Sequence, residues 1–240
     1  MDARALAAEA AALAARRGAR AVLGLAGPPG AGKSTLARAL VDALRSRAIY
    51  VPAAYVPLDG FHLSNAQLDR LGLRSRKGAE QTFDVWGYVA LLHRLLDPAQ
   101  AGHDIYVPDF DRTLDEPVAA RHRVRPEARL IVTEGNYLAC DLPGWREARA
   151  CMAEVWYVDA PPALRDARLF ARHTAHGDRP AAARARVDGN DRPNAAMVER
   201  SRARCDRVLS GPGAGGGSTA APGRPTGPGG PGTEGGRGGA

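Results

Sequence analysis

Paired cysteines and long apolar segments are both missing from this sequence of 240 residues. Its three cysteines, Cys140, Cys151 and Cys205, are widely separated and form no C-x-x-C pair, which argues against a disulfide framework or a zinc site. No segment approaches the roughly 18 uninterrupted apolar residues of a membrane-spanning helix. The Ala-rich start also lacks the pattern of a signal peptide, because Glu9 and several arginines interrupt it. We therefore expect a cytoplasmic protein with reduced thiols and no membrane partner.

Bulky apolar side chains are scarce at the C-terminal end of the sequence. Residues 211–240 are mostly Gly and Pro, with scattered Ser, Thr and Ala. Such a segment cannot bury enough apolar surface to offset the entropy lost on ordering it, so we expect a disordered Gly/Pro-rich tail. Residues 1–210 then form one folded domain, which is long enough for a complete α/β core.

Negative charge is in the minority, with 26 Asp and Glu against 33 Lys and Arg, and the net charge is +7. Basic proteins often bind nucleic acid. Here, however, the basic residues are spread along the chain and mixed with acids, and no DNA-binding motif is present. An electropositive surface that attracts anionic nucleotides explains the charge equally well. The sequence therefore argues against a nucleic-acid ligand, and it leaves the oligomeric state open, a homo-oligomer included.

Lysine is the scarcest basic residue, because only Lys33 and Lys77 stand among the 33 Lys and Arg. Since arginine serves almost everywhere else, the lysine at position 33 indicates a need for a compact ammonium that can fold over a phosphate chain. Lys33 lies in a match to the phosphate-loop motif G-x-x-x-x-G-K-[ST]. The residues predicted to bind ATP are Gly27, Pro28, Pro29, Gly30, Ala31, Gly32, Lys33, Ser34 and Thr35.

The residues around this motif have the pattern that the motif requires. An apolar run at 21–26 is typical of a buried strand, and Leu36, Leu40 and Leu44 recur with the spacing of a helix. In such a strand, loop and helix unit, backbone N–H groups and the helix N-terminus face the phosphates of a nucleotide. Lys33 would neutralise the β- and γ-phosphates, and the hydroxyl of Ser34 would bind Mg²⁺. We therefore predict ATP and Mg²⁺ as cofactors.

Strand and helix patterns alternate along the chain. This alternation predicts an α/β protein of the P-loop NTPase type, with three layers and a parallel five-stranded sheet covered by helices on both faces. The predicted strands are 21–26, 53–58, 130–133, 154–159 and 207–209, and the predicted helices include 2–17, 65–71 and one that begins after 83–84.

Carboxylates lie at the ends of three of these strands. Because ligands bind beyond the carboxyl ends of parallel strands, Asp59 and Glu134 should lie beside the loop that begins at Gly27. Glu134 is the candidate metal ligand together with Ser34, since both would face the same cation. Asp59, at a strand tip and followed by a glycine, is the candidate base for the proton of an attacking hydroxyl. Asp159 has the same position, but it fits an ordinary turn.

Four segments occur in the order and approximate spacing seen in one group of kinases. They are D-G-F-H at 59–62, F-D at 83–84, V-P-D-F-D-R at 107–112 and V-T-E-G-N-Y at 132–137. Residues 20 to 210 thereby resemble the uridine kinase, phosphoribulokinase and bacterial pantothenate kinase superfamily. The resemblance implies that Asp59 is the general base and that Asp84 binds sugar hydroxyls. It also implies a small helical lid, on which Arg168 and Arg172 neutralise the transferred phosphoryl group.

The acceptor region departs from each of these kinases. Uridine kinases typically read D-S-F-Y where this chain reads D-G-F-H, pantothenate kinases carry D-G-F, and Phe110 replaces the tyrosine of a P-x-Y-D segment. The sequence is most similar to bacterial nucleoside/nucleotide kinase-like proteins. The resemblance implies an ATP-dependent kinase that phosphorylates a hydroxyl of a nucleoside, pantothenate or a sugar. The predicted acceptor contacts are Phe61, His62, Lys77, Asp84, Arg112 and Tyr137.

Two other functions remain as alternatives. The segment D-L-P-G at 141–144 matches the D-x-x-G pattern of GTPases, but the pattern is short, and neither lysine follows an Asn as the guanine-binding N-K-x-D motif requires. A nucleic-acid-binding P-loop protein is supported by the charge alone. The kinase hypothesis accounts for more of the motifs than either alternative does.

Overall fold

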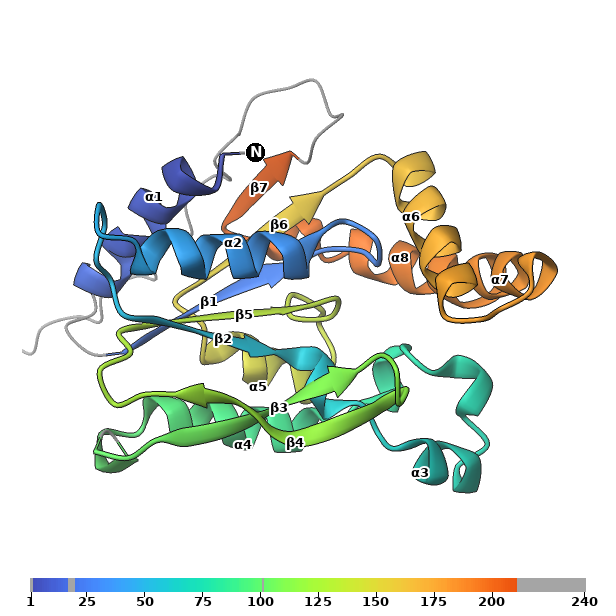
Figure 1. Ribbon diagram of the computed structural model, residues 1–240, viewed down its shortest axis with the longest axis horizontal. Helices are drawn as coiled ribbons and strands as arrows, with labels where there is room; N and C mark the ends of the chain where they lie inside the picture. Colours follow the sequence, from blue (N-terminus) through green and yellow to red (C-terminus); the bar gives the residue numbers. More distant parts are fainter. Residues whose placement is uncertain (1, 17–19, 101, 211–240) are drawn as a thin grey trace, which may run out of the picture.

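A five-stranded parallel sheet forms the centre of the molecule (Figure 1). The computed structural model describes residues 2–16, 20–100 and 102–210, so the predicted tail at 211–240 lies outside the described residues. The strand order is β2-β5-β1-β6-β7. The predicted α/β class and parallel sheet are thereby confirmed. The strands are β1 (Ala21–Ala26), β2 (Ala53–Pro57), β5 (Leu130–Gly135), β6 (Glu154–Asp159) and β7 (Arg207–Ser210).

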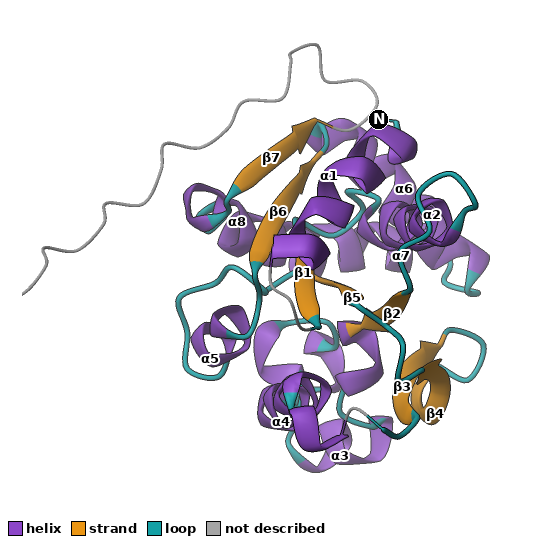
Figure 2. Ribbon diagram, turned by 90° about the vertical axis from the view of Figure 1, so that its left-hand side faces the viewer, coloured by secondary structure: helices purple, strands orange, loops and turns teal. Residues whose placement is uncertain are grey.

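Helices cover both faces of this sheet and produce two apolar cores (Figure 2). One face carries α1 (Ala3–Arg16) and α2 (Lys33–Arg45), and the other carries α4 (Val85–Leu96), α5 (Trp145–Ala150) and α8 (Arg192–Glu199). Strand β1 sends Leu23 and Leu25 to the first core and Val22 to the second. Because both faces are buried, the strand reads as an unbroken apolar run.

Three further helices lie beyond the carboxyl ends of the strands. They are α3 (Asn65–Arg70), α6 (Pro162–Ala175) and α7 (Pro180–Arg186), and a π-helical turn (Val187–Asp191) leads from α7 into α8. The segment predicted as a lid is thus helical, and it projects from the sheet past the end of β6 (Figure 1). Within the described ranges, no helix combines the length and apolarity needed to cross a membrane.

An antiparallel hairpin, β3 (Ile105–Asp111) and β4 (Glu116–Val124), is absent from the predicted strands. It lies outside the central sheet, beside β2 (Figure 2). Its pairing shifts register between Val107 and Asp109, and β4 is half-buried or exposed up to its last residue, so neither strand shows an unbroken apolar run. The hairpin packs closely on the turn after β2, because a Cβ at Gly60 would lie 2.5 Å from the carbonyl carbon of Pro108.

Arg20, which directly precedes β1, joins three segments at the end of the sheet away from the lid. Its guanidinium donates hydrogen bonds of 2.9 to 3.2 Å to the carbonyl oxygens of Leu95, Arg125, Pro126 and Ala128. A hydrogen bond from a charged donor contributes about 1.5–3 kcal/mol. We therefore expect Arg20→Ala to lower the free energy of unfolding by about 2 kcal/mol or more, measured by urea denaturation.

The matched control for this variant is Arg94→Ala, which removes an exposed arginine of α4. An exposed substitution of this kind should change the free energy of unfolding by less than about 0.5 kcal/mol. If the two variants unfold at the same urea concentration, the four carbonyl contacts of Arg20 do not stabilise the fold.

Candidate functional site

A cleft of about 680 Å³ lies beyond the carboxyl ends of β1, β2 and β5. The register of the sheet explains which side chains meet there. Pro57 near the end of β2 pairs with Glu134 of β5, and β5 pairs in turn with β1, which leads into the phosphate loop. The structure thereby brings Lys33, Asp59 and Glu134 together in one cleft. Asp159 is not among the lining residues.

The phosphate loop has the backbone geometry of an anion site. Gly32 adopts a left-handed φ of 96° at the start of α2, and a Cβ at Gly27 would lie 2.4 Å from the carbonyl oxygen of Val158. The first helical hydrogen bond of α2 runs from the N–H of Leu36 to the oxygen of Gly32. The N–H groups before Leu36 therefore lack helical acceptors and are available to a ligand. This arrangement fits the phosphates of a nucleotide.

Lys33 is buried at the centre of this loop. Its Nζ donates to the carbonyl oxygen of Pro28 at 3.0 Å and to Oδ1 of Asn136 at 2.7 Å. Burial lowers the pKa of Lys33 to about 8, although the charges of Glu134 and Asp59 act in the opposite direction. A phosphate group beside Nζ would supply further negative charge and favour the ammonium form.

Glu134 is fixed by two hydroxyl groups. Ser34 Oγ and the Tyr55 hydroxyl both donate to its Oε1, at 3.0 and 2.8 Å. Burial raises the pKa of the Glu134 carboxyl, the charge of Asp59 raises it further, and Lys33 opposes both. A divalent cation at this position would stabilise the carboxylate form. Within residues 2–16, 20–100 and 102–210, no group of three His, Cys, Asp or Glu side chains could hold a metal ion.

Asp59 lies in a 3₁₀ turn, Leu58–Phe61, immediately after β2. Its carboxylate lies 3.6 Å from the guanidinium of Arg112 and is about one-third exposed to the cleft. The carbonyl oxygen of Asp59 accepts a hydrogen bond of 2.8 Å from Nδ1 of His62, so Nδ1 carries the proton. Burial lowers the pKa of His62, which keeps its imidazole neutral near pH 7. The turn therefore presents a carboxylate and a neutral imidazole to the same space.

The six predicted acceptor contacts divide into two groups. His62, Lys77 and Arg112 line the cleft, whereas Phe61, Asp84 and Tyr137 do not. The Asp84 carboxylate caps α4 by accepting from the N–H of Gly87 at 2.9 Å. Tyr137 is fully buried, and its hydroxyl donates to the carbonyl oxygen of Gly78. Phe61 packs against Tyr88 in the core.

The lid contributes arginines to the opposite wall of the cleft. Arg168 lies over the phosphate loop, where it donates to the carbonyl oxygen of Gly30 at 3.1 Å. Arg172, one turn further along α6, is half-buried and also lines the cleft. Burial lowers its pKa, and the neighbouring guanidinium of Arg112 lowers it further. The two lid arginines thus face the phosphate side and the hairpin side of the cleft.

Sequence reasoning missed Asn136 and Tyr55, the partners of Lys33 and Glu134. Asn136 follows Glu134 by two residues, so its position directly after a strand could have indicated that it lies in the site. Tyr55 lies inside a strand, where its sequence position does not distinguish it from the other residues of that strand. The GTPase-like D-x-x-G segment lies elsewhere, because Asp141 does not line the cleft and instead pairs with Arg204 at 2.6 Å.

The chain belongs to the phosphoribulokinase / uridine kinase family, whose sequence model matches residues 22–155. Membership places it among the P-loop kinases, which are phosphotransferases that use ATP. YFH7 of Saccharomyces cerevisiae has the same fold, with a TM-score of 0.74 at 20% identity over 88% of this chain and 98% of that one. The predicted family and P-loop fold are therefore confirmed, and the predicted activity is confirmed at the level of a kinase.

The chain is similar over much of its length to proteins whose names refer to different acceptors. A Schizosaccharomyces pombe protein with the provisional name uridine kinase is 34% identical over 199 residues, which cover 79% of this chain and 83% of that protein. A pantothenate kinase of Corynebacterium glutamicum is 31% identical over 65% of this chain and 50% of its own length. The crystal structure of a kinase from Silicibacter sp. TM1040, provisionally assigned to a fructose transport system, has a TM-score of 0.78 at 39% identity, over 87% of this chain and 99% of that chain.

Proposed function

We propose that the protein is an ATP-dependent kinase that transfers the γ-phosphoryl group to a hydroxyl of a small molecule of the nucleoside, pantothenate or sugar type. The observation that supports this proposal is the meeting of Lys33 and Asp59 in one cleft. A phosphate loop alone accounts for nucleotide binding. A carboxylate on the acceptor side of the same cleft accounts for a second substrate with an ionisable hydroxyl.

The proposed roles follow from the positions of the side chains. The N–H groups at the start of α2 and the ammonium of Lys33 bind the phosphates of ATP, and Arg168 lies on the outer side of the same loop. Arg172 faces the place where phosphate and acceptor meet. His62 and Arg112 form the acceptor side, next to Asp59. The phosphoryl group would therefore pass between the positive charges on the ATP side and those on the acceptor side.

The reaction is an in-line displacement at the γ-phosphorus. The acceptor hydroxyl passes its proton to the Asp59 carboxylate while its oxygen forms a bond to phosphorus. The bond between that phosphorus and the bridging oxygen breaks, and ADP leaves with the electron pair. The proton on Asp59 returns to solvent when the phosphorylated product dissociates.

Side chains at the start of α2 and the end of β5 fit Mg²⁺, since Ser34 and Glu134 supply oxygen ligands of the kind that this ion prefers. When bound, Mg²⁺ would neutralise part of the phosphate charge. Glu134 would hold it directly or through water, and Ser34 would contribute its hydroxyl. ATP phosphates and water would complete the ligand set.

Tyr55→Phe should weaken cation binding, because the variant removes one of the two donors that orient Glu134. Loss of such an orienting hydrogen bond typically lowers metal affinity by about tenfold or more. We expect the dissociation constant for Mn²⁺ in the presence of ATP to rise by about tenfold, measured by electron paramagnetic resonance. Tyr106→Phe, which alters an exposed tyrosine of β3, is the control. Equal Mn²⁺ affinities in the two variants would contradict the role of Tyr55.

An acceptor screen tests the proposed function. Purified protein with ATP and Mg²⁺ is incubated with nucleosides, pantothenate, sugars and sugar phosphates, and ADP formation is followed by a coupled assay. We expect one class to accelerate ADP formation by at least about tenfold. Absence of any acceptor-dependent ADP across the panel would contradict the proposal, and selective GTP binding without an acceptor would favour a GTPase. Salt-sensitive nucleic-acid binding unchanged by Lys33→Ala would favour the third alternative.

The proposal extends to the whole chain in three respects. We propose one kinase domain at residues 1–210, and the predicted tail lies outside the described residues. The cysteines of the described part are free thiols, which is consistent with the cytoplasmic location expected from the sequence. A homo-oligomer is compatible with the proposal, which requires only the residues of one chain.

A further inference from the structure

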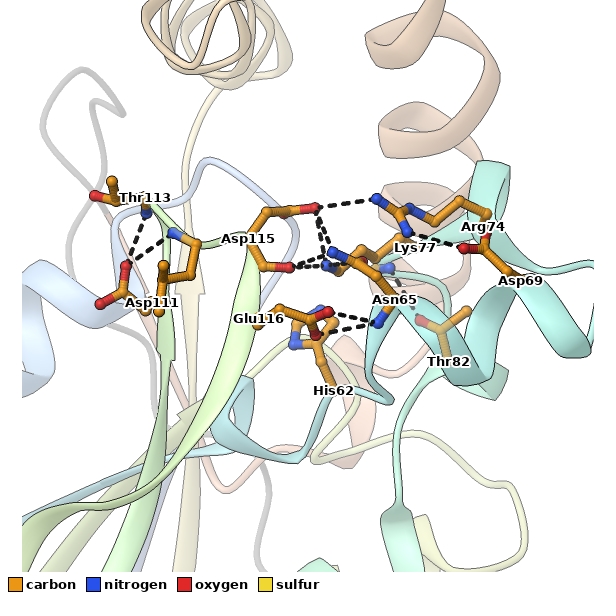
Figure 3. Close-up of polar contacts among 12 residues, drawn as sticks. His62, Asn65, Asp69, Arg74, Lys77, Thr82, Asp111, Thr113, Asp115 and Glu116 are labelled. Carbon is orange, nitrogen blue, oxygen red and sulfur yellow. Dashed lines mark hydrogen bonds and ion pairs between the residues drawn. The ribbon is translucent and has the colours of Figure 1, made fainter.

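One part of the cleft wall on the acceptor side is a turn, residues 111–116, between β3 and β4. Three of its side chains, those of Arg112, Thr113 and Asp115, line the cleft. The turn is shaped internally by the Asp111 carboxylate, which accepts hydrogen bonds from the N–H groups of Thr113 at 2.9 Å and Leu114 at 3.1 Å (Figure 3). Arg112 within this turn is the residue that reaches Asp59.

Lys77 enters this turn from the loop after α3. Its ammonium donates to Oδ1 of Asn65 at 2.6 Å and to the carbonyl oxygen of Asp115, and it lies 3.0 Å from the Asp115 carboxylate (Figure 3). It also lies over the ring of Phe110, 4.8 Å from the centroid. An ammonium has three N–H donors, and three acceptors surround this one. Lys77 therefore has no donor left for a ligand.

Further contacts join the same parts of the chain. Both carboxylate oxygens of Glu116 accept from the N–H of Asn65 at 3.0 Å, and Nδ2 of Asn65 donates to the carbonyl oxygen of Asp115 at 2.9 Å, so the turn is attached to the start of α3 at two points. The carbonyl oxygen of Lys77 accepts from Nδ2 of Asn190, which belongs to the π-helical turn of the lid segment. Lys77 thus links the acceptor wall, α3 and the lid segment through one residue.

Stability alone does not explain a charge at this position. Lys77 is only 7% exposed, and replacing a buried ion pair by apolar side chains is often neutral for stability. The chain also uses arginine almost everywhere else, and an ammonium spreads its three donors around one nitrogen atom, whereas the donors of a guanidinium lie in one plane. A compact ammonium at position 77 is best explained by a need to hold turn 111–116 in one position relative to α3.

We infer that Lys77 is a positioning residue for the acceptor: it fixes turn 111–116 to the α3 segment so that Arg112 faces Asp59. This inference rests on the proposed kinase function. It differs from the role expected from the sequence, which was direct contact between Lys77 and the acceptor. In the inferred role, Lys77 holds the hairpin in place, and Arg112 contacts the acceptor.

Lys77→Met tests the inference by two measurements. The KM for the acceptor should rise by at least about tenfold while the dissociation constant for ATP changes by less than about twofold, because the phosphate loop is untouched. In the absence of any substrate, hydrogen–deuterium exchange of peptides covering 111–116 should become faster, with exchange at 27–35 unchanged. The control is Arg74→Gln, which removes a half-exposed partner 4.0 Å from the same Asp115 carboxylate and should change neither quantity.

The outcomes are separable. Unchanged exchange at 111–116, or an unchanged acceptor KM in Lys77→Met, overturns the inference, as does a parallel loss of acceptor and ATP binding with a lower melting temperature. If wild-type protein uses no acceptor, the proposed function fails, and the exchange measurement still decides whether Lys77 fixes the turn. If Lys77→Met does not fold, Asn65→Ala removes one acceptor of the same ammonium together with the hydrogen bond from Nδ2 of Asn65 to the carbonyl oxygen of Asp115. That variant should raise exchange at 111–116, and unchanged exchange overturns the inference.

Discussion

Replacing Asp59 with Asn is expected to lower kcat by at least about 100-fold while leaving the affinity for ATP nearly unchanged. The amide has the size of the carboxylate, so the 3₁₀ turn and the contact between Gly60 and the hairpin should persist. It cannot accept the proton of the acceptor hydroxyl. Turnover would be measured as ADP release with the acceptor found in the screen, and ATP affinity by calorimetry.

The matched control is Asp159→Asn. Asp159 ends β6, as Asp59 follows β2, but the Asp159 carboxylate pairs with Arg202 at 3.6 Å and does not line the cleft. We expect turnover of this variant to stay within about twofold of wild type. An Asp59→Asn protein with near-normal kcat would exclude Asp59 as the base, and a large loss in both variants would point to a general effect of changing charge near the sheet edge.

Lys33→Ala should lower kcat/KM for ATP by about 10²- to 10³-fold, the scale of removing one preorganised donor from a transition state. The ammonium is held between Pro28 and Asn136 at the centre of the phosphate loop, so no other side chain can take its place. The melting temperature should fall little, because burial lowers the pKa of Lys33 and the folded state therefore disfavours its charge. Steady-state kinetics and thermal melting together separate the chemical effect from a structural one.

Lys33→Arg is the informative companion of this variant. It keeps the positive charge, but a planar guanidinium does not fit a site built around two acceptors at 2.7 and 3.0 Å. We expect its kcat/KM to remain at least about tenfold below wild type. Full activity in Lys33→Arg would show that charge alone suffices, and it would remove the compositional argument for a lysine at position 33.

The central sheet could be predicted because its inner strands are buried on both faces. In β1 and β5 every residue is buried, and this produces the apolar runs that the sequence shows. The order of the strands could not be predicted, because it depends on pairings between residues far apart in the sequence, such as Ala21 with Leu130. The hairpin was missed for a different reason. Its strands are partly exposed and interrupted at Pro108, so local periodicity carries little signal.

The residues of the candidate site could be predicted where a motif or a strand end places them in the cleft. They could not be predicted where the direction of the side chain determines whether a residue reaches the cleft. The loop around Lys33 and the carboxylates Asp59 and Glu134 follow from motif and strand ends. Asp84 and Tyr137 belong to matching segments, yet their side chains point to a helix N-terminus and to the core. Side-chain direction depends on packing against distant elements, which sequence order does not give. Composition, in contrast, singled out Lys77, whose ammonium the structure places among three acceptors.

The close packing of Gly60 against Pro108 bears on how the substrate range of this protein can change over evolution. Any side chain at position 60 would push the hairpin away from the turn that holds Asp59. The backbone on the acceptor side is therefore constrained, and new acceptor preferences should arise by exchanging exposed side chains of 111–116 while the main chain stays in place. Relatives that accept different molecules would then differ in the residues of this turn far more than in its length.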